Sequence, residues 1–220
     1  MEEEPVPIAM TPSRVLILVA SAATLAVSAT AQVIEFESGG LRYRTLTRRG
    51  VTVMFAQLPS TVREYSIVQV AVSNGSERKA TIQPTSFEFH LSDGAVVRAA
   101  GPELVIRELM ERGNRDDVVK LVSAYEAGLY GIVRFRSTNG FEQRRQAALS
   151  ESVNPRLRAA AAASAIVLVE TTLKPGESTD GVIFLPTEGK PLGEGYLVGR
   201  AAGEVFDFQF EPAGPTLQTR

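Results

Sequence analysis

The sequence contains no cysteine and no tryptophan, and it has one histidine among its 220 residues. The lack of cysteine excludes disulfides, zinc–thiolate sites, iron–sulfur clusters and a cysteine nucleophile. A histidine-based zinc site takes several imidazole or thiolate ligands, which this chain cannot supply. The lack of tryptophan removes the ring that best binds methylammonium groups. We therefore expect neither a metal site nor a bound cofactor.

Charge is nearly balanced, with 25 acidic and 23 basic side chains and a formal net charge of −2 at pH 7. This balance gives no indication of a nucleic-acid or anionic-membrane partner. Apolar residues make up 44% of the chain, which is enough for one domain with a sizeable core. We therefore expect a globular protein that binds no nucleic acid and, once processed, no membrane.

Residues 1–31 have the features of a secretory signal peptide. Arg14 precedes an apolar run from Val15 to Val27, and Ala29 and Ala31 follow at the spacing of a cleavage site. The strongly apolar part is shorter than the roughly 20 residues that a membrane span needs. We expect export to the periplasm or the outside of a bacterial cell, with an uncleaved membrane anchor as the alternative. An exported chain without cysteine must be held together by core packing.

The first ten residues lead to a prediction about the precursor. Glu2 to Glu4 make the start acidic, whereas a signal peptide starts basic, and translation from Met10 would give the better basic segment. We predict that sequencing of the precursor finds Met10 first and that the exported protein begins at Gln32. A precursor peptide that contains Glu2 to Glu4 would contradict the internal start.

Alternating apolar residues predict antiparallel strands on both sides of the middle of the chain. Residues 41–58 indicate a hairpin that turns at Arg49-Gly50 and ends at Pro59. Residues 68–73 and 87–91 indicate a second strand pair, joined through the turn dipeptide Asn74-Gly75 with positive φ. Further strands are expected at 95–100, 165–173 and 182–186 and in a final hairpin at 195–210.

Residues 101–164 have a helical period and interrupt this strand pattern. Pro102 is suited to the first position of a helix that ends at Gly113. Asn114 and Asp117 have the spacing of a capping box for a second helix. Because the helices form one block, they cannot be the crossovers of a parallel sheet. We interpret them as an insertion between middle strands.

Three further boundaries belong to this helical insertion. The second helix is expected to end at Gly128, and residues 141–152 are expected to form a third helix that Pro155 breaks. The alanine-rich run after Pro155 predicts another helical piece. Residues 211–220 are expected to be a flexible tail of the single domain, 32–220.

The order of strands, helices and strands favours a mainly β fold, an antiparallel β-sandwich of about eight short strands with a helical insertion. Two motifs resemble small secreted immunoglobulin-like domains of bacteria, of the mycobacterial secreted immunogenic antigen type and of other envelope proteins. One motif is a valine-rich strand that ends at Asn-x-Ser, and the other is Pro-Gly-Glu before a strand containing Gly-x-Ile-Phe. The matching residues are Val70, Val72, Asn74, Ser76, Pro175, Gly176, Glu177, Gly181, Ile183 and Phe184.

This resemblance covers about residues 41–100 and 165–210 and does not cover the helical insertion. It implies an immunoglobulin-like fold and an extracytoplasmic setting. It implies no catalytic residues.

His90 is the one histidine that a catalytic triad could use. Alternation places it with Glu88 and Ser92 on the strand face opposite Phe87 and Phe89, so we expect it to point outward. A serine nucleophile needs a positioned hydroxyl, and the sequence has no Gly-x-Ser-x-Gly elbow. We therefore expect His90 to be a solvated histidine or one that lines a groove.

Carboxylates are the remaining candidates for catalysis. Asp93 and Asp180 each precede a glycine and indicate turns, and Asp116 and Asp117 fall in the first turn of a helix, where acids favour the dipole. We therefore expect a protein that is not an enzyme. The alternative is a carboxylate-dependent extracytoplasmic hydrolase with a groove between the insertion and the sandwich.

Four arginines of the insertion form a candidate partner or anion surface. Guanidinium groups match carboxylates and phosphates, although a solvated helix face with buried side-chain stems is the simpler interpretation. The apolar helix stripes either pack on the sandwich or dock another envelope protein or a second copy. We expect a binding or assembly module of the bacterial envelope, with recognition in the insertion. The four residues are Arg134, Arg136, Arg144 and Arg145.

Overall fold

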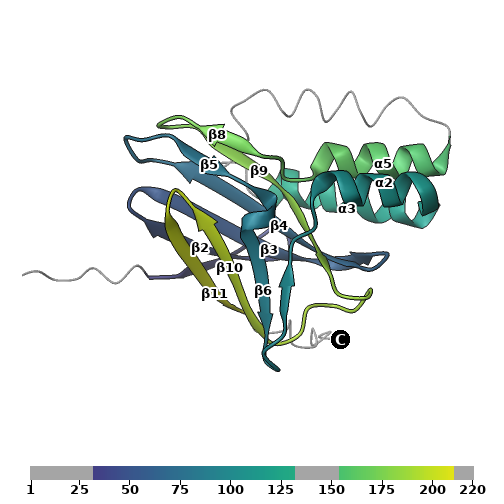
Figure 1. The fold of residues 1–220 in the computed structure, drawn as a ribbon, viewed down its shortest axis with the longest axis horizontal. Helices are drawn as coiled ribbons and strands as arrows, with labels where there is room; N and C mark the ends of the chain where they lie inside the picture. The colour runs from purple at the N-terminus through teal and green to yellow at the C-terminus, as the bar shows by residue number, and fades with distance from the viewer. Residues whose placement is uncertain (1–31, 132–153, 211–220) are drawn as a thin grey trace, which may run out of the picture. The chain divides into compact units, whose positions relative to one another are not determined.

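The computed structural model describes residues 32–131 and 154–210, and these residues form a mainly β structure with antiparallel sheets (Figure 1). The signal-peptide segment, the expected third helix, the four arginines and the tail lie outside the described residues. The strands are β1 Ile34–Ser38, β2 Leu41–Arg48, β3 Val51–Val62, β4 Tyr65–Asn74, β5 Ala80–Ile82, β6 Phe87–Leu91, β7 Val96–Arg98, β8 Thr171–Leu173, β9 Ser178–Pro186, β10 Gly195–Ala201 and β11 Glu204–Phe210. The helices are η2 Pro84–Ser86, α2 Pro102–Arg112, α3 Arg115–Gly131 and α5 Pro155–Ile166.

The strands form three sheets. The five-stranded sheet has the order β1-β2-β3-β4-β9, the four-stranded sheet β11-β10-β6-β7, and β5 pairs with β8. The predicted pairing of residues 68–73 with 87–91 is therefore wrong, because β4 and β6 belong to different sheets. The partners of β4 are β3 and β9, and the partners of β6 are β10 and β7. The predicted final hairpin is confirmed as β10 and β11.

The dipeptide Asn74-Gly75 does not form the expected tight turn, because Gly75 does not adopt a positive φ. Its N–H donates to the carbonyl of Gly50 at 2.8 Å, and a Cβ there would lie 2.9 Å from that oxygen. Glycine is needed for this close approach of two backbones. The chain then continues to β5 and η2 before it reaches β6 in the other sheet.

Asn74 is a fully buried polar residue whose side chain joins three segments. Its Nδ2 donates to the carbonyl oxygens of Arg78, at 2.7 Å, and Leu173, at 3.1 Å. Its Oδ1 accepts from the N–H and the hydroxyl of Ser76. A buried amide is tolerated when its donors and acceptors are paired in this way. Asn74 therefore holds the end of β4 against β8.

The hairpin of β2 and β3 is confirmed, and its turn has the predicted residues. Arg49 and Gly50 have φ values of 45° and 80°, and two positive φ angles are typical of a type I′ turn. The predicted end at Pro59 is wrong, because β3 continues to Val62 with a register shift between Gln57 and Thr61. The exposed Pro59 lies at this irregularity, where a missing N–H costs no ladder hydrogen bond.

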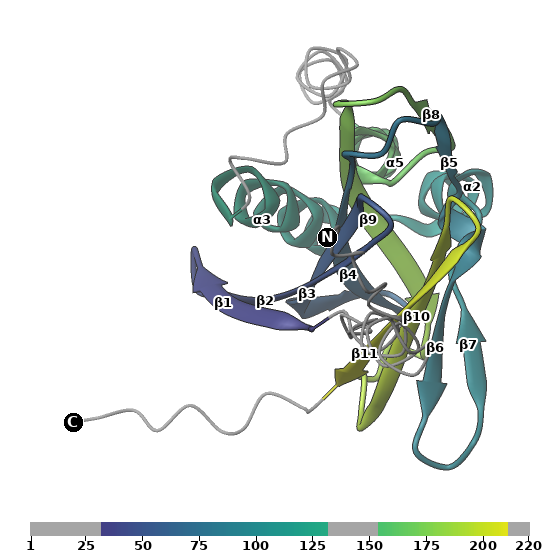
Figure 2. The same cartoon turned by 90° about the vertical axis from the view of Figure 1, so that its left-hand side faces the viewer.

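The inner strands of the five-stranded sheet are covered on both faces, by the four-stranded sheet on one side and by helices on the other (Figure 2), whereas the edge strand β1 is exposed. On one face Phe55, Val70 and Ile183 share a core with phenylalanines of the four-stranded sheet, and Phe55 meets the ring of Phe208 edge-on at 4.7 Å. On the other face Ile67 and Phe184 pack against the helices. Burial on both sides explains why β4 and β9 are apolar almost throughout, since such strands lose the alternation of half-exposed ones.

Helices α2 and α3 begin as predicted. Pro102 is at the start of α2, and Gly113 follows its last residue. The Oδ1 atom of Asn114 accepts from the N–H of Asp117 at 2.9 Å, and the Oδ2 atom of Asp117 accepts from the N–H of Asn114 at 3.0 Å. This reciprocal pair is a capping box. The predicted end at Gly128 is wrong, because α3 includes Gly131.

The helical piece predicted after Pro155 is confirmed as α5, and Pro155 itself begins it. The helix that Pro155 was expected to break lies outside the described residues. At the first position of α5 the missing N–H of Pro155 needs no partner, and Asn154 caps the helix through a bond from the N–H of Arg156. Helix α5 extends to Ile166, so the strand expected from residue 165 begins only at Thr171. The alanines of α5 are mostly buried against the sheet and the neighbouring helices.

We predict that Asn74→Ala lowers the free energy of unfolding by about 2–3 kcal/mol, because it leaves several buried donors and acceptors without partners. Gln83→Ala is the control, since Gln83 is exposed and its side chain donates to the exposed Glu170 carboxylate at 3.2 Å. Its effect should stay within about 0.5 kcal/mol. Urea unfolding of the exported chain measures both. Equal stability of the two variants would contradict the structural role of Asn74.

Candidate functional site

The outer face of the four-stranded sheet carries a group of polar side chains. Along β6, Phe87 and Phe89 are fully buried in the core, while Glu88 and His90 point to the other face. The prediction that His90 points outward is confirmed, and its side chain is 24% exposed. Alternation along the strand predicted Glu88 on the same face as His90 but identified no partner from another strand.

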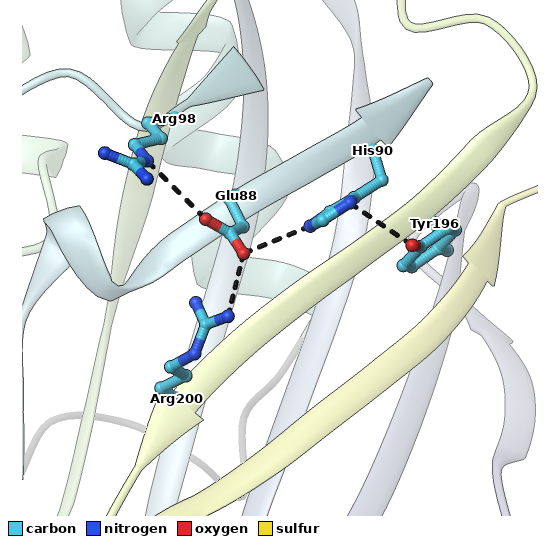
Figure 3. A network of polar contacts seen from close by, with 5 residues as sticks. All are labelled: Glu88, His90, Arg98, Tyr196 and Arg200. Atoms are coloured by element: carbon cyan, nitrogen blue, oxygen red, sulfur yellow. Dashed lines mark hydrogen bonds and ion pairs between the residues drawn. The ribbon is translucent and has the colours of Figure 1, made fainter. Parts of the chain in front are cut away.

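Glu88 is the centre of this group (Figure 3). Its Oε1 accepts from Nη2 of Arg200 at 2.9 Å and lies 3.1 Å from Nε2 of His90. Its Oε2 lies 3.6 Å from Nε of Arg98. Strand register explains the contacts, since Arg98 of β7 is directly opposite Glu88 and Arg200 of β10 is a diagonal neighbour.

The charges around Glu88 keep it ionised. The hydrogen bond from Arg200 and then that from His90 lower the pKa of the Glu88 carboxyl, against the opposing effect of burial. The side chain of Glu88 is only 11% exposed, whereas those of Arg200 and Arg98 are 54% and 80% exposed. One carboxylate therefore holds two guanidinium groups that remain open to solvent, and the group as a whole is positively charged.

His90 stacks on Tyr196, which is directly opposite it on β10. The ring centroids are 4.6 Å apart and the planes differ by 15°. The Tyr196 hydroxyl is 3.2 Å from Nδ1 of His90, but near-parallel rings put it outside the imidazole plane, in which the nitrogen donates or accepts. The pair is therefore held mainly by stacking. It does not have the in-plane geometry of a proton relay.

An open hollow adjoins this group at the β7 edge. Its volume is about 710 Å³, and apolar and charged side chains line it together. Within the described residues, Glu88 is the single acid of the lining. The lining residues are Glu88, His90, Val96, Val97, Arg98 and Pro186.

The other residues considered for catalysis do not join this group. Asp93 accepts from the N–H of Ala95 in the β6–β7 turn, as expected. The prediction of a turn at Asp180 is wrong, because Asp180 lies within β9, is buried, and has Nε2 of Gln69 at 3.5 Å from its Oδ2. Asp117 belongs to the capping box. Arg134, Arg136, Arg144 and Arg145 lie outside the described residues, so their role stays a prediction.

The described residues lack two further features that would bear on function. Residues 32–131 and 154–210 contain no group of three or more His, Cys, Asp or Glu side chains placed to hold a metal ion. In the same part of the chain, no helix has both the length and the apolar character needed to cross a membrane.

Comparison with known proteins adds little. No protein-family model matches the chain, and no curated protein matches it. Among solved structures, the yjhA protein from Bacillus subtilis is similar over 76% of each chain, with 12% sequence identity and a TM-score of 0.30. A similarity at this level supports no argument about fold or function. The resemblance to secreted immunoglobulin-like domains therefore stays a prediction.

Sequence reasoning missed Arg98, Tyr196 and Arg200 as members of the site. Alternation along each strand assigns their face but not the strand that lies beside them. His90 and Tyr196 are 106 positions apart in the sequence, with the helical block between them. The pairing of β6 with β10 brings Tyr196 to His90, which no local pattern indicates.

We predict that Glu88→Gln removes a contribution to stability that depends on pH. Because the folded-state pKa of Glu88 is lowered, its contribution is fully present above the unfolded-state pKa and is lost as pH falls through the folded-state pKa. At neutral pH the variant should be less stable by about 1 kcal/mol, and this difference should shrink in acid. Urea unfolding across a pH series measures the effect.

Glu188→Gln is the matched control for this experiment. The hydrogen bond from Lys190 lowers the pKa of Glu188 as well, but both side chains are highly exposed. An exposed ion pair contributes little, so the control should unfold like the wild type. The same pH dependence in wild type and Glu88→Gln would refute the stabilising role of the Glu88 network.

Proposed function

We propose that this protein is an exported, non-enzymatic binding or assembly module of the bacterial envelope, with an immunoglobulin-like sandwich fold. The observation that carries the proposal is the ordered outer face of the four-stranded sheet, where Glu88 holds two exposed arginines beside an open hollow. Side chains fixed on a rigid sheet before a ligand arrives lose little entropy when it binds. This arrangement favours recognition.

The sandwich and export parts of the proposal have separate support. Two antiparallel sheets share one core of buried apolar residues, as the layers of a sandwich do. Export is supported by the basic residue, apolar run and small residues of segment 14–31. The alternative of an uncleaved membrane anchor rests on the same segment.

The chemistry of the hollow supports binding over hydrolysis. A carboxylate-dependent hydrolase uses two acids, and one of them must be protonated at working pH. Among the described residues the lining holds Glu88 alone, and its pKa is lowered rather than raised. A carboxylate kept ionised by a guanidinium group is poorly suited to donate a proton.

The helical insertion has two roles in this proposal. Its described helices bury Val105, Leu109 and Leu121 against the five-stranded sheet, which favours packing over docking for the apolar stripes. The arginines from Arg134 to Arg145 remain the part of the insertion that we propose as a partner surface. The outer face around Glu88 is the second candidate surface.

Cross-linking in the native envelope tests the proposed function. We predict that the full chain, tagged and expressed in its own cell, is recovered from the periplasmic or extracellular fraction with a reproducible protein partner. Arg144→Ala with Arg145→Ala should lower this recovery about tenfold if the insertion binds the partner. Arg107→Ala is the control, because Arg107 is an exposed arginine of α2.

Three results of this experiment would contradict parts of the proposal. A chain that stays in the cytoplasm would refute export, and a chain fixed in the membrane fraction would favour the uncleaved anchor. Recovery of no partner by cross-linking would refute the binding function. Recovery unchanged in the Arg144 and Arg145 variant would exclude the arginine surface and leave the outer face as the binding surface.

A further inference from the structure

Strand β7 forms one edge of the four-stranded sheet and borders the hollow. The N–H of Ala99 donates to the carbonyl of Phe87, and the N–H of Leu91 donates to that of Ala95. Hydrogen-bonded pairs alternate along an antiparallel ladder, so the backbone groups of Val96 and Arg98 point away from β6. In the described part of the chain, these two residues have no backbone partner. The N–H of Ala100, next on the same side, donates to the carbonyl of Phe184 in β9 at 2.8 Å, so the open part of the edge is limited to Val96 and Arg98.

The side chains beside this edge combine positive charge with apolar surface. Arg98 of β7 lines the hollow with its side chain 80% exposed. Arg200 of β10 lies on the other side of β6 and pairs with Glu88 at 2.9 Å, so the charge of Glu88 is matched without Arg98. Val96, which is 48% exposed, and Pro186 provide apolar contact in the same hollow. Asp207 on the same sheet pairs with Arg48 at 2.7 Å, so its charge is already matched.

We propose that this hollow binds an extended acidic peptide segment of a partner protein. The segment adds to the sheet beside β7, and a carboxylate of the segment contacts Arg98. Guanidinium groups bind carboxylates through two parallel hydrogen bonds, and an exposed strand edge supplies main-chain hydrogen bonds to an extended chain. The inference rests on the proposed binding function and names the ligand class and the site.

The geometry favours a peptide over other anions. An open hollow does not enclose a small ion, and a single exposed ion pair contributes little to affinity. Binding must therefore add several contacts along a chain, as strand addition does. Nucleic acid would need many phosphate contacts, whereas this face offers two arginines with one charge already matched by Glu88.

A display library of random decapeptides tests the inference on the full exported chain. We expect selection on the wild type to enrich peptides in which Asp or Glu stands among β-forming residues. A synthetic copy of an enriched peptide should bind Arg98→Gln about tenfold more weakly. Arg107→Gln, on exposed helix surface, should bind it like the wild type.

A second measurement separates strand addition from simple charge attraction. N-methylation of the peptide amides that face β7 should weaken binding, because it removes their N–H donors. N-methylation of the other amides should leave binding unchanged, because only every second N–H faces β7. Circular dichroism and thermal unfolding of each variant confirm that the sheet is intact. These controls separate loss of the site from loss of the fold.

Several outcomes would overturn the inference. They are selection without acidic residues, equal binding by Arg98→Gln, insensitivity to amide methylation, and competition by acetate or inorganic phosphate at the peptide's own concentration. If the envelope partner is recovered equally by Arg98→Gln, this site is refuted while the binding function stands. If no envelope partner is recovered, the proposed function itself fails.

Discussion

Burial of the inner strands β4 and β9 on both faces is the constraint on which the rest of the structure depends. Val70 and Ile183 face one core, while Ile67 and Phe184 face the other. Each fully buried side chain of this kind contributes about 1.5–3 kcal/mol. Neither cover is dispensable, because removing the helices or the second sheet would expose a continuous apolar surface. The helical insertion is thus one layer of the structure as well as a candidate for recognition.

This layering decides which surface is available to a ligand. The inner face of the four-stranded sheet is occupied by phenylalanines of the core, so the outer face is where polar side chains gather. There Glu88 is mostly buried and must be paired, since an unpaired buried carboxylate is costly. Arg200 of β10 and Arg98 of β7 meet this need from the two strands beside Glu88. The pairing that stabilises Glu88 therefore also positions Arg98 at the β7 edge, where we propose binding.

Two glycine sites show where local patterns lead to the correct structure and where they do not. Arg49-Gly50 is a turn because both φ angles are set within the dipeptide. Asn74-Gly75 has an equally strong turn signal, yet Gly75 is required by the carbonyl of Gly50 that approaches it from another hairpin. Glycine is needed at position 50 for the backbone angles of its own turn, and at position 75 for the close approach of a distant segment.

The sequence by itself determined the mainly β class, the helix starts at Pro102 and after Asn114, the alanine-rich helix after Asn154, and the outward face of His90. These features depend on neighbours within a few positions, whose spacing is visible in the chain. Only the tertiary structure decided that β4 and β6 lie in different sheets and that His90 meets Tyr196. Strand order and register depend on how much apolar surface the whole molecule buries, which includes contacts between segments far apart in the chain. The pairing of β6 with β10 across the helical block therefore leaves no local trace in either segment.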